Sequence, residues 1–207
     1  MTLLALLRVN DSQVLLFADS GEFVLDSASK SLTLSNLTEK FQEEQYGTEE
    51  VIIGWAGVTA RADNTKTIMK KYVGSNWDEF ASCVRFAVER TNDLFGWGES
   101  AGMLEVMICQ RSDTRVDTLV VNPRGEVGEE RSGLSVIAPS DRSRLLSQWE
   151  TLVALRPEPT PWDLLPLLDT AICDSQLLEP PLNVWELSPN GLSKLARSSE
   201  VLFCSLS

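Results

Sequence analysis

Residues 1–20, MTLLALLRVNDSQVLLFADS, contain two short apolar runs, residues 3–7 and residues 14–18, on either side of a polar segment. Short apolar runs that are bounded by turn residues are typical of buried strands, so this stretch predicts a β-hairpin with its tip in the polar segment. A hairpin brings its two ends together. We therefore expect Asp19, where the second strand ends, to lie beside Thr2, where the first strand begins.

Thr2 gains a second reactive group if the peptide bond before it is cut. Removal of Met1 leaves a hydroxyl and a free α-amine on one residue, with the carboxylate of Asp19 close by. Because an α-amine has a pKa of about 7.7–8.0, it can act as the base for its own hydroxyl. A small second residue favours methionine removal in the cytosol, so we expect Met1 to be lost. The alternative interpretation is that Thr2 simply permits this removal.

The sequence contains no histidine, and this restricts the chemistry that an enzyme of this sequence could use. Ser-His-Asp and Cys-His catalysis are excluded, as are metal sites with histidine ligands. The acid–base group of any such enzyme must be a carboxylate, Lys, Tyr, Cys or a terminal amine, which increases the weight of Thr2. The cysteines are far apart and form no Cys-x-x-Cys pair, which favours buried free thiols in a reducing compartment over disulfides or zinc.

Length and charge limit the class of protein. A chain of 207 residues can bury one sizeable core, so we expect a single domain over residues 1–207. The net charge of −12, without a run of Lys or Arg, argues against nucleic acid as a partner. Neither a signal peptide nor a membrane-spanning run is evident, so we expect a cytoplasmic protein that does not bind membranes.

Residues 2–20 resemble the opening of proteasome β-type subunits and of the bacterial HslV peptidase, which are N-terminal-nucleophile (Ntn) hydrolases. Those proteins begin with Thr, continue through a hairpin and reach Ala-Asp-Ser, as this chain does if its turn has one extra residue near Ser12. The resemblance continues at residues 39–41, Glu-Lys-Phe, and 54–57, Gly-Trp-Ala-Gly, and in the order of later elements. It therefore spans nearly the whole chain, and the motifs are more specific together than singly.

The resemblance implies that Thr2 is a nucleophile with Asp19 and Lys40 as its electrostatic partners. A lysine ammonium near the Thr2 hydroxyl favours the alkoxide and lowers the pKa of the amine, while Asp19 keeps the lysine charged and oriented. Lys30 competes for this role because it is nearer to Asp19 in sequence. Lys40 is preferred because Phe41 follows it, and an apolar residue also follows the family's lysine. Either lysine could instead be a solvated surface residue.

The segment from Trp55 to Gly57 implies two further roles. The backbone N–H of Gly57 would stabilise the oxyanion of a tetrahedral intermediate, whereas the alternative is a glycine needed only for a strand-to-helix bend. Trp55 falls where the family lines its side-chain specificity pocket, which a tryptophan would narrow or cover. Trp55 could equally be an aromatic residue of the core.

The supporting residues depart from the family pattern. The family's Gly-Ser-Gly-Ser is Ile-Ala-Pro-Ser at residues 137–140, so an alanine replaces the serine that assists the terminal amine, and Ser140 could instead cap a helix. The family's Asp-x-x-Ser-Gly is Asp-Ser-Gln-Leu-Leu at residues 174–178. Asp174 and Ser175 remain as groups that could reach the amine.

Patterns in the remaining sequence predict strands, two helices, strands, two helices and strands, in that order. Residues 42–50 are expected to form an acidic surface turn, residues 126–129 a strand, and Pro166 is expected to bend or shorten its helix. This order matches the α+β fold of the Ntn family, a four-layer αββα sandwich with two antiparallel sheets between two helical layers.

The resemblance implies a threonine-type endopeptidase subunit that cleaves peptides or unfolded proteins within a homo-oligomeric, stacked ring. It implies no metal and no organic cofactor, and an ATPase unfoldase is the partner to consider. Two alternatives remain open. One is a catalytically inactive scaffold or regulatory subunit with the same fold, which the missing serines favour. The other is an Ntn amidase acting on small amides, although the arginine-lined carboxylate pocket usual in such enzymes cannot be located in the sequence.

Overall fold

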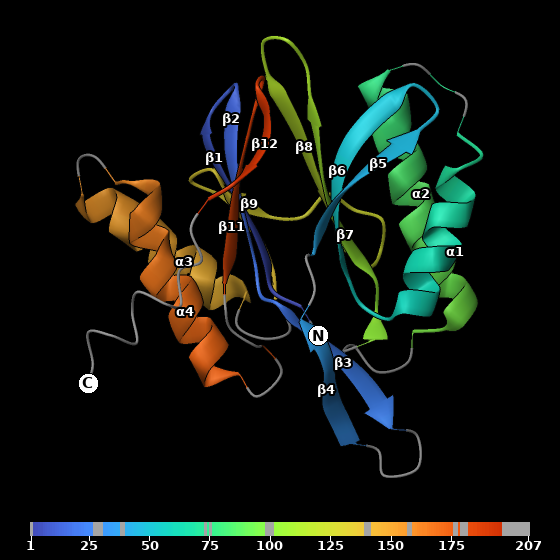
Figure 1. Cartoon of the computed structure of the whole chain (residues 1–207), viewed down its shortest axis with the longest axis horizontal. Helices are drawn as coiled ribbons and strands as arrows, with labels where there is room; N and C mark the ends of the chain where they lie inside the picture. The colour runs from blue at the N-terminus through green and yellow to red at the C-terminus, as the bar shows by residue number, and fades with distance from the viewer. Residues whose placement is uncertain are drawn as a thin grey trace.

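A computed structural model of the protein gives the fold as four layers, with two β-sheets packed face to face between two pairs of helices (Figure 1). For residues 22–26 and 31–37 only the backbone is described. The structure describes residues 2–26, 31–37, 40–72, 74, 76–97, 102–138, 142–156, 159–175, 178 and 182–195.

The first sheet is antiparallel and contains both strands of the N-terminal hairpin at its centre, in the strand order β12-β11-β2-β1-β10-β9. Strands β1 and β2 are the predicted hairpin, which is therefore confirmed. The six strands are β1 (Leu4–Asn10), β2 (Gln13–Ala18), β9 (Glu130–Arg131), β10 (Leu134–Ile137), β11 (Asn183–Ser188) and β12 (Gly191–Lys194).

The second sheet is also antiparallel, with the order β5-β6-β7-β8, and a separate two-stranded ribbon of β3 and β4 projects beyond the two sheets (Figure 1). The ribbon pairs with neither sheet along the described residues. The bounds are β3 (Gly21–Asp26), β4 (Ser31–Leu37), β5 (Phe41–Tyr46), β6 (Glu49–Ala56), β7 (Glu105–Arg111) and β8 (Val116–Val121).

Two expectations about strands were wrong. Residues 42–50 are not a turn: they belong to β5 and β6, which are joined by a two-residue turn at Gly47 and Thr48. The acidic composition misled because β5 is an edge strand, whose polar residues face solvent while its two end residues are buried. Residues 126–129 make only one isolated bridge, through Val127, and the paired strand follows them as β9.

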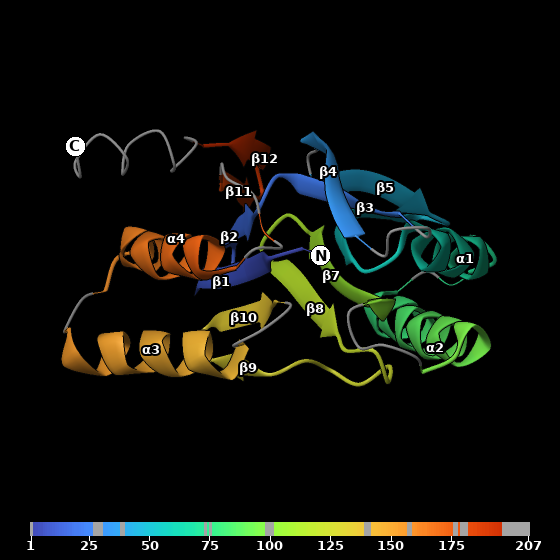
Figure 2. The ribbon, with the colours of Figure 1, turned by 90° about the horizontal axis from the view of Figure 1, so that it is seen from below.

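Each sheet is covered on its outer face by one pair of helices (Figure 2). Pro166 lies in the first turn of α4, where proline is tolerated, and the preceding residues Pro161–Leu164 form a 3₁₀ helix, so the expected shortening of the helix is confirmed. None of the described helices is long and apolar enough to cross a membrane. The helices are α1 (Thr59–Met69) and α2 (Trp77–Phe95) on the second sheet, and α3 (Arg142–Leu155) and α4 (Leu165–Asp174) on the first.

The continuous apolar run in β1 is explained by burial on both faces of its sheet. Leu3, Ala5 and Leu7 pack in the cluster under α3 and α4, whereas Leu4 and Leu6 pack in the cluster between the two sheets. Successive side chains of a strand point to opposite faces, so both faces of β1 need apolar residues.

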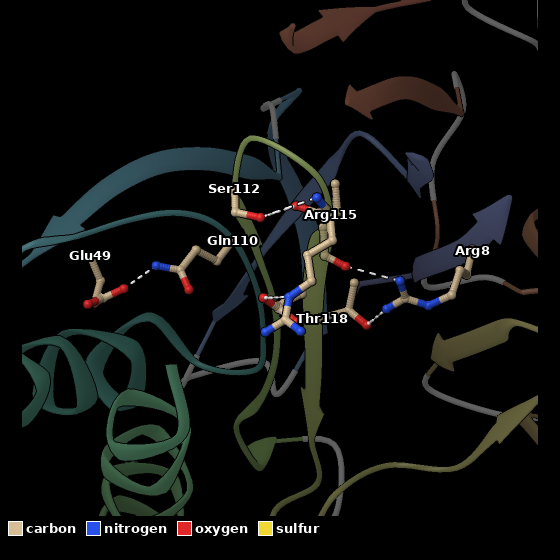
Figure 3. A network of polar contacts seen from close by, with 8 residues as sticks. Arg8, Glu49, Gln110, Ser112, Arg115 and Thr118 are labelled. Atoms are coloured by element: carbon tan, nitrogen blue, oxygen red, sulfur yellow. Dashed lines mark hydrogen bonds and ion pairs between the residues drawn. The ribbon is translucent and has the colours of Figure 1, made fainter. Parts of the chain in front are cut away.

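Polar contacts join the two sheets at the end of β1 that lies away from Thr2 (Figure 3). Arg8 of β1 donates through Nη1 to the carbonyl of Val116 at 3.0 Å and through Nη2 to Oγ1 of Thr118 at 2.5 Å, both on β8. The backbone N–H of Val116 donates to the carbonyl of Asp11 at 2.8 Å. These bonds hold the sheets together at one end, and the candidate site lies at the other.

Candidate active site

The pairing of β1 with β2 brings Thr2 and Asp19 to the same end of the hairpin. Leu4 pairs with Ala18, and the ladder continues with the backbone N–H of Asp19 donating to the carbonyl of Leu3 at 3.2 Å. Thr2 is 8% exposed and Asp19 is fully buried. The register of β1 shifts between Arg8 and Asn10, close to where one extra residue was expected.

The carboxylate of Asp19 is held by two backbone N–H groups. Leu3 donates to Oδ1 at 2.8 Å and Gly21 donates to Oδ2 at 3.1 Å. One bond reaches back to the residue that follows Thr2, and the other closes the turn that leaves β2. Asp19 therefore fixes the backbone of the residue that follows Thr2 and the backbone of the turn after β2.

Lys40 lies immediately before β5, and its side chain reaches the first residue of β3. Its Nζ donates to the carbonyl of Gly21 at 2.5 Å, and its charge acts on the Asp19 carboxylate. The ammonium and the carboxylate are thus both bound to Gly21, at the turn that follows β2. The competing lysine, Lys30, lies outside the described residues, so the structure offers no comparison between the two.

Burial raises the pKa of Asp19 from 3.8 to about 6. The positive charge of Lys40 and the N–H bonds from Leu3 and Gly21 act in the opposite direction, but the loss of hydration outweighs them. The carboxylate is therefore ionised at neutral pH and becomes protonated under mildly acidic conditions.

This shift predicts a pH-dependent change in stability. The folded protein keeps the Asp19 proton up to about pH 6, whereas the unfolded chain loses it near pH 3.8, so the folded state binds more protons between these values. The contribution of Asp19 to the free energy of unfolding should therefore fall as the pH rises through this window, by about 3 kcal/mol in total, and stay constant above it. Urea unfolding at several pH values measures the change.

Asp19→Asn is the control for this titration, since asparagine has no proton to lose. As the pH rises from about 4 to about 6, the free energy of unfolding of the wild type should fall relative to that of Asp19→Asn. A difference that stays constant across this window would contradict the raised pKa.

Gly57 follows the last residue of β6 and has a backbone conformation that favours glycine, with φ of +133°. A Cβ at this position would lie 2.6 Å from the carbonyl oxygen of Met103 and 3.0 Å from Cα of Leu104. The backbone therefore requires glycine here whether or not its N–H has a catalytic role. Its role as oxyanion donor stays a prediction.

Gly57→Ala should lower the free energy of unfolding by about 2–4 kcal/mol, because it adds backbone strain and a clash with main-chain atoms. Gly96→Ala is a matched control: Gly96 has φ of +81°, but its Cβ would meet no atom within 4 Å. Alanine at Gly96 should cost only the strain, about 1 kcal/mol. Urea unfolding measures the loss of unfolding free energy in each variant. Equal losses would show that the clash with the carbonyl of Met103 does not contribute to the destabilisation.

Trp55 packs on the side of the second sheet that faces α1 and α2. It is partly buried against the apolar cluster there, and the Nζ of Lys66 lies 5.2 Å from the centroid of its ring. Lys66 is paired in turn with Glu44 at 2.6 Å. The indole Nε1 is buried and has no hydrogen-bond partner among the described residues. These contacts are those of an aromatic core residue, and a pocket-lining role stays a prediction.

The expected supporting residues lie at the end of α4 or outside the described chain. Asp174 ends α4 and pairs with Arg144 of α3 at 3.7 Å. Ser175 follows α4, and its N–H donates to the carbonyl of Ile172 at 3.1 Å. Ser140 lies outside the described residues, while Ala138 packs against the cluster under α3 and α4. The role of Asp174 toward the amine stays a prediction.

Sequence reasoning missed a buried pair, Ser20 and Asn183. Both side chains are 3% exposed, and Nδ2 of Asn183 donates to Oγ of Ser20 at 2.5 Å. Ser20 belongs to the Ala-Asp-Ser segment, but only Asp19 of that segment was given a role. Asn183 is the first residue of β11, and the one available signal was a polar residue at the start of an apolar strand pattern.

Two of the described cysteines, Cys109 and Cys83, are poorly suited to nucleophilic chemistry. Cys109 is buried, and burial raises the pKa of its thiol to about 12. Burial also raises the pKa of Cys83. Within the part of the chain that the structure describes, no three His, Cys, Asp or Glu side chains are grouped so that they could hold a metal ion.

Comparisons with known proteins support the fold. No family model and no curated protein matches the chain in sequence. Solved structures do match: Anbu (ancestral β-subunit) from Yersinia bercovieri has a TM-score of 0.63 at 12% identity, covering 98% of this chain and 90% of its own. An Anbu (Gly-1) mutant from Hyphomicrobium sp. strain MC1 has a TM-score of 0.67 at 14% identity, covering 100% and 92%. Eukaryotic HslV from Trypanosoma brucei has a TM-score of 0.59 at 16% identity, covering 90% and 99%.

The chain therefore has the α+β fold of proteasome-like Ntn hydrolases, and the predicted four-layer αββα sandwich is confirmed. At identities of 12–16%, the similarity to these structures shows a shared fold alone. The chemistry of this chain must be argued from its own residues.

Proposed function

We propose that the protein is a proteasome-like threonine peptidase subunit, in which Thr2 becomes the N-terminal nucleophile after the bond that precedes it is cut. One observation carries this proposal: Asp19 and Lys40 bring a buried carboxylate and an ammonium to the turn beside Thr2. Asp19 binds the N–H of Leu3, and Lys40 binds the carbonyl of Gly21. An opposite charge close to the Thr2 hydroxyl would favour its ionised form.

The reaction needs only groups of this chain, a peptide and water. The free α-amine of Thr2 takes the hydroxyl proton as Oγ attacks the carbonyl carbon of the peptide bond. The N–H of Gly57 stabilises the resulting oxyanion, and the protonated amine then passes its proton to the leaving nitrogen. The ester left on Thr2 is hydrolysed by water, with the amine again as base. Lys40 and Asp19 set the charge around Oγ throughout.

We further propose that the subunits form a homo-oligomeric, stacked ring in the cytoplasm that admits peptides or unfolded proteins, with an ATPase unfoldase as a candidate partner. Four large apolar side chains on or just after α2 are exposed by 46–65%, which supports a protein surface as their partner. Because each subunit carries a net charge of −12, assembly should strengthen as salt screens the repulsion. The four are Phe86, Leu94, Phe95 and Trp97.

A catalytically inactive scaffold subunit is the second candidate function. It is favoured by the contacts of the supporting residues, since Asp174 is paired with Arg144 and an alanine stands at position 138. In this function the Asp19–Lys40 pair would stabilise the fold without serving a nucleophile. A small-amide Ntn hydrolase is a weaker third candidate.

Peptide hydrolysis together with covalent labelling separates these candidates. The purified protein should cleave fluorogenic peptides, and a threonine-directed electrophile should form one adduct per subunit, located on Thr2 by peptide mapping. An inactive scaffold predicts neither result. Hydrolysis of small amides without cleavage of any peptide would support the amidase instead. Labelling at a residue other than Thr2 would contradict the proposed nucleophile.

A further inference from the structure

Ser20 and Asn183 join the end of the hairpin to the first residue of β11. The amide of Asn183 donates to the Ser20 hydroxyl at 2.5 Å, and both residues are 97% buried. Asn183 also pairs with Ala18 across the β2–β11 ladder, so its backbone is fixed at the same point. A buried hydroxyl held by a buried amide has a defined orientation.

The strand registers place this pair next to Thr2. On β1 and β2, Leu4 pairs with Ala18, and both pack between the two sheets. The bond from the N–H of Asp19 to the carbonyl of Leu3 continues the pairing one residue beyond the strands, so the next residues, Thr2 and Ser20, come together at the end of the hairpin. Asn183 lies opposite Ala18 and binds Ser20, which places Ser20 on the side of the hairpin that faces the second sheet.

The hydrogen-bonding capacity of Ser20 suits a position beside an amine. A serine hydroxyl can take part in more than one hydrogen bond, and the Asn183 amide supplies one of them. The same oxygen can accept an N–H from the α-amine of a processed Thr2. Such a bond would turn the lone pair of the amine toward Oγ of Thr2, which the amine must deprotonate.

We propose that Ser20, held by Asn183, is a positioning residue that orients the α-amine of Thr2. The inference rests on the proposed function, because only a processed Thr2 has that amine. In this chain Ser20 would take the role of the family's serine that assists the amine, because an alanine stands at position 138. Ser20 and Asn183 act through the amine and touch neither substrate nor oxyanion.

Ser20→Ala tests the inference by steady-state kinetics over a range of pH. Without its acceptor the amine is less well oriented, so kcat should fall about tenfold while KM changes less than about twofold. The acid limb of the pH profile should move to lower pH, because a lost acceptor destabilises the ammonium form. Ser20→Thr keeps the oxygen and should recover most of kcat. Asn183→Ala should shift kcat in the same direction as Ser20→Ala.

Ser135→Ala is the matched control, since it removes the hydroxyl of another buried serine in the same sheet, opposite Leu6. It should leave kcat and the pH profile unchanged. Equal effects at Ser20 and Ser135, or an unchanged profile in Ser20→Ala, overturn the positioning role. Should Ser20→Ala not fold, Asn183→Ala carries the same test. If the wild type neither cleaves peptides nor is labelled at Thr2, the proposed function fails and the positioning role fails with it. If the wild type is active and only the Ser20 predictions fail, the positioning role alone is overturned.

Discussion

Thr2→Ala is expected to abolish peptide hydrolysis, with a loss of at least about 10³-fold in kcat/KM. The variant keeps a small residue at position 2, so methionine removal stays possible and the α-amine is retained. What it loses is the oxygen that forms the ester. Thr2→Ser restores that oxygen and should retain measurable hydrolysis, which separates loss of the nucleophile from a change in structure. Initial rates with one fluorogenic peptide give the comparison.

The stability of these variants provides the control. Thr2 is 8% exposed but lies at the end of the hairpin, so removing its hydroxyl and methyl should lower the free energy of unfolding by about 1 kcal/mol. A Thr2→Ala protein that is folded and still cleaves peptides at the wild-type rate would refute Thr2 as the nucleophile.

Lys40→Met should lower kcat/KM by about 10²–10⁴-fold while the protein remains folded. The ammonium of Lys40 donates to the carbonyl of Gly21 and opposes the burial that raises the pKa of Asp19. Without this charge the Thr2 alkoxide is less favoured, and the pKa of Asp19 rises further, so the carboxylate is protonated at higher pH. The acid limb of the pH–rate profile should therefore move to higher pH in this variant.

Lys66→Met is the matched control for Lys40→Met. Lys66 is also a partly buried lysine that binds a carboxylate, but its partner is Glu44, on the outer side of the second sheet. Its loss should change stability and leave the pH–rate profile in place. If the two lysine variants reduce hydrolysis equally, Lys40 has no specific electrostatic role.

The sequence was most informative where local pattern and tertiary structure agree. The apolar runs of residues 3–7 and 14–18 predict strands because both faces of β1 and β2 are buried, one under α3 and α4 and one between the sheets. The contact between the Asp19 carboxylate and the start of β1 follows from the hairpin alone. Lys40 required the family resemblance, since nothing in its own segment predicts a bond to Gly21.

The sequence was least informative where tertiary pairing decides the outcome. The acidic residues of β5 form a strand because β6 pairs with them along one edge while β5 ends the sheet on the other, and composition reveals neither. Asn183 could not be linked to Ser20 because 163 residues separate them, and only the pairing of β11 with β2 brings them together. The glycine at position 57 is fixed by Met103, another contact across distant segments.

The N-terminal residue of the purified protein tests the central claim most directly, since the proposed chemistry needs a free amine on Thr2. Intact mass and N-terminal sequencing, before and after reaction with a threonine-directed electrophile, report both the processing and the reactivity of that residue. We expect a chain that begins at Thr2 and gains one adduct there. A chain that retains Met1 and takes up no adduct would contradict the proposed chemistry.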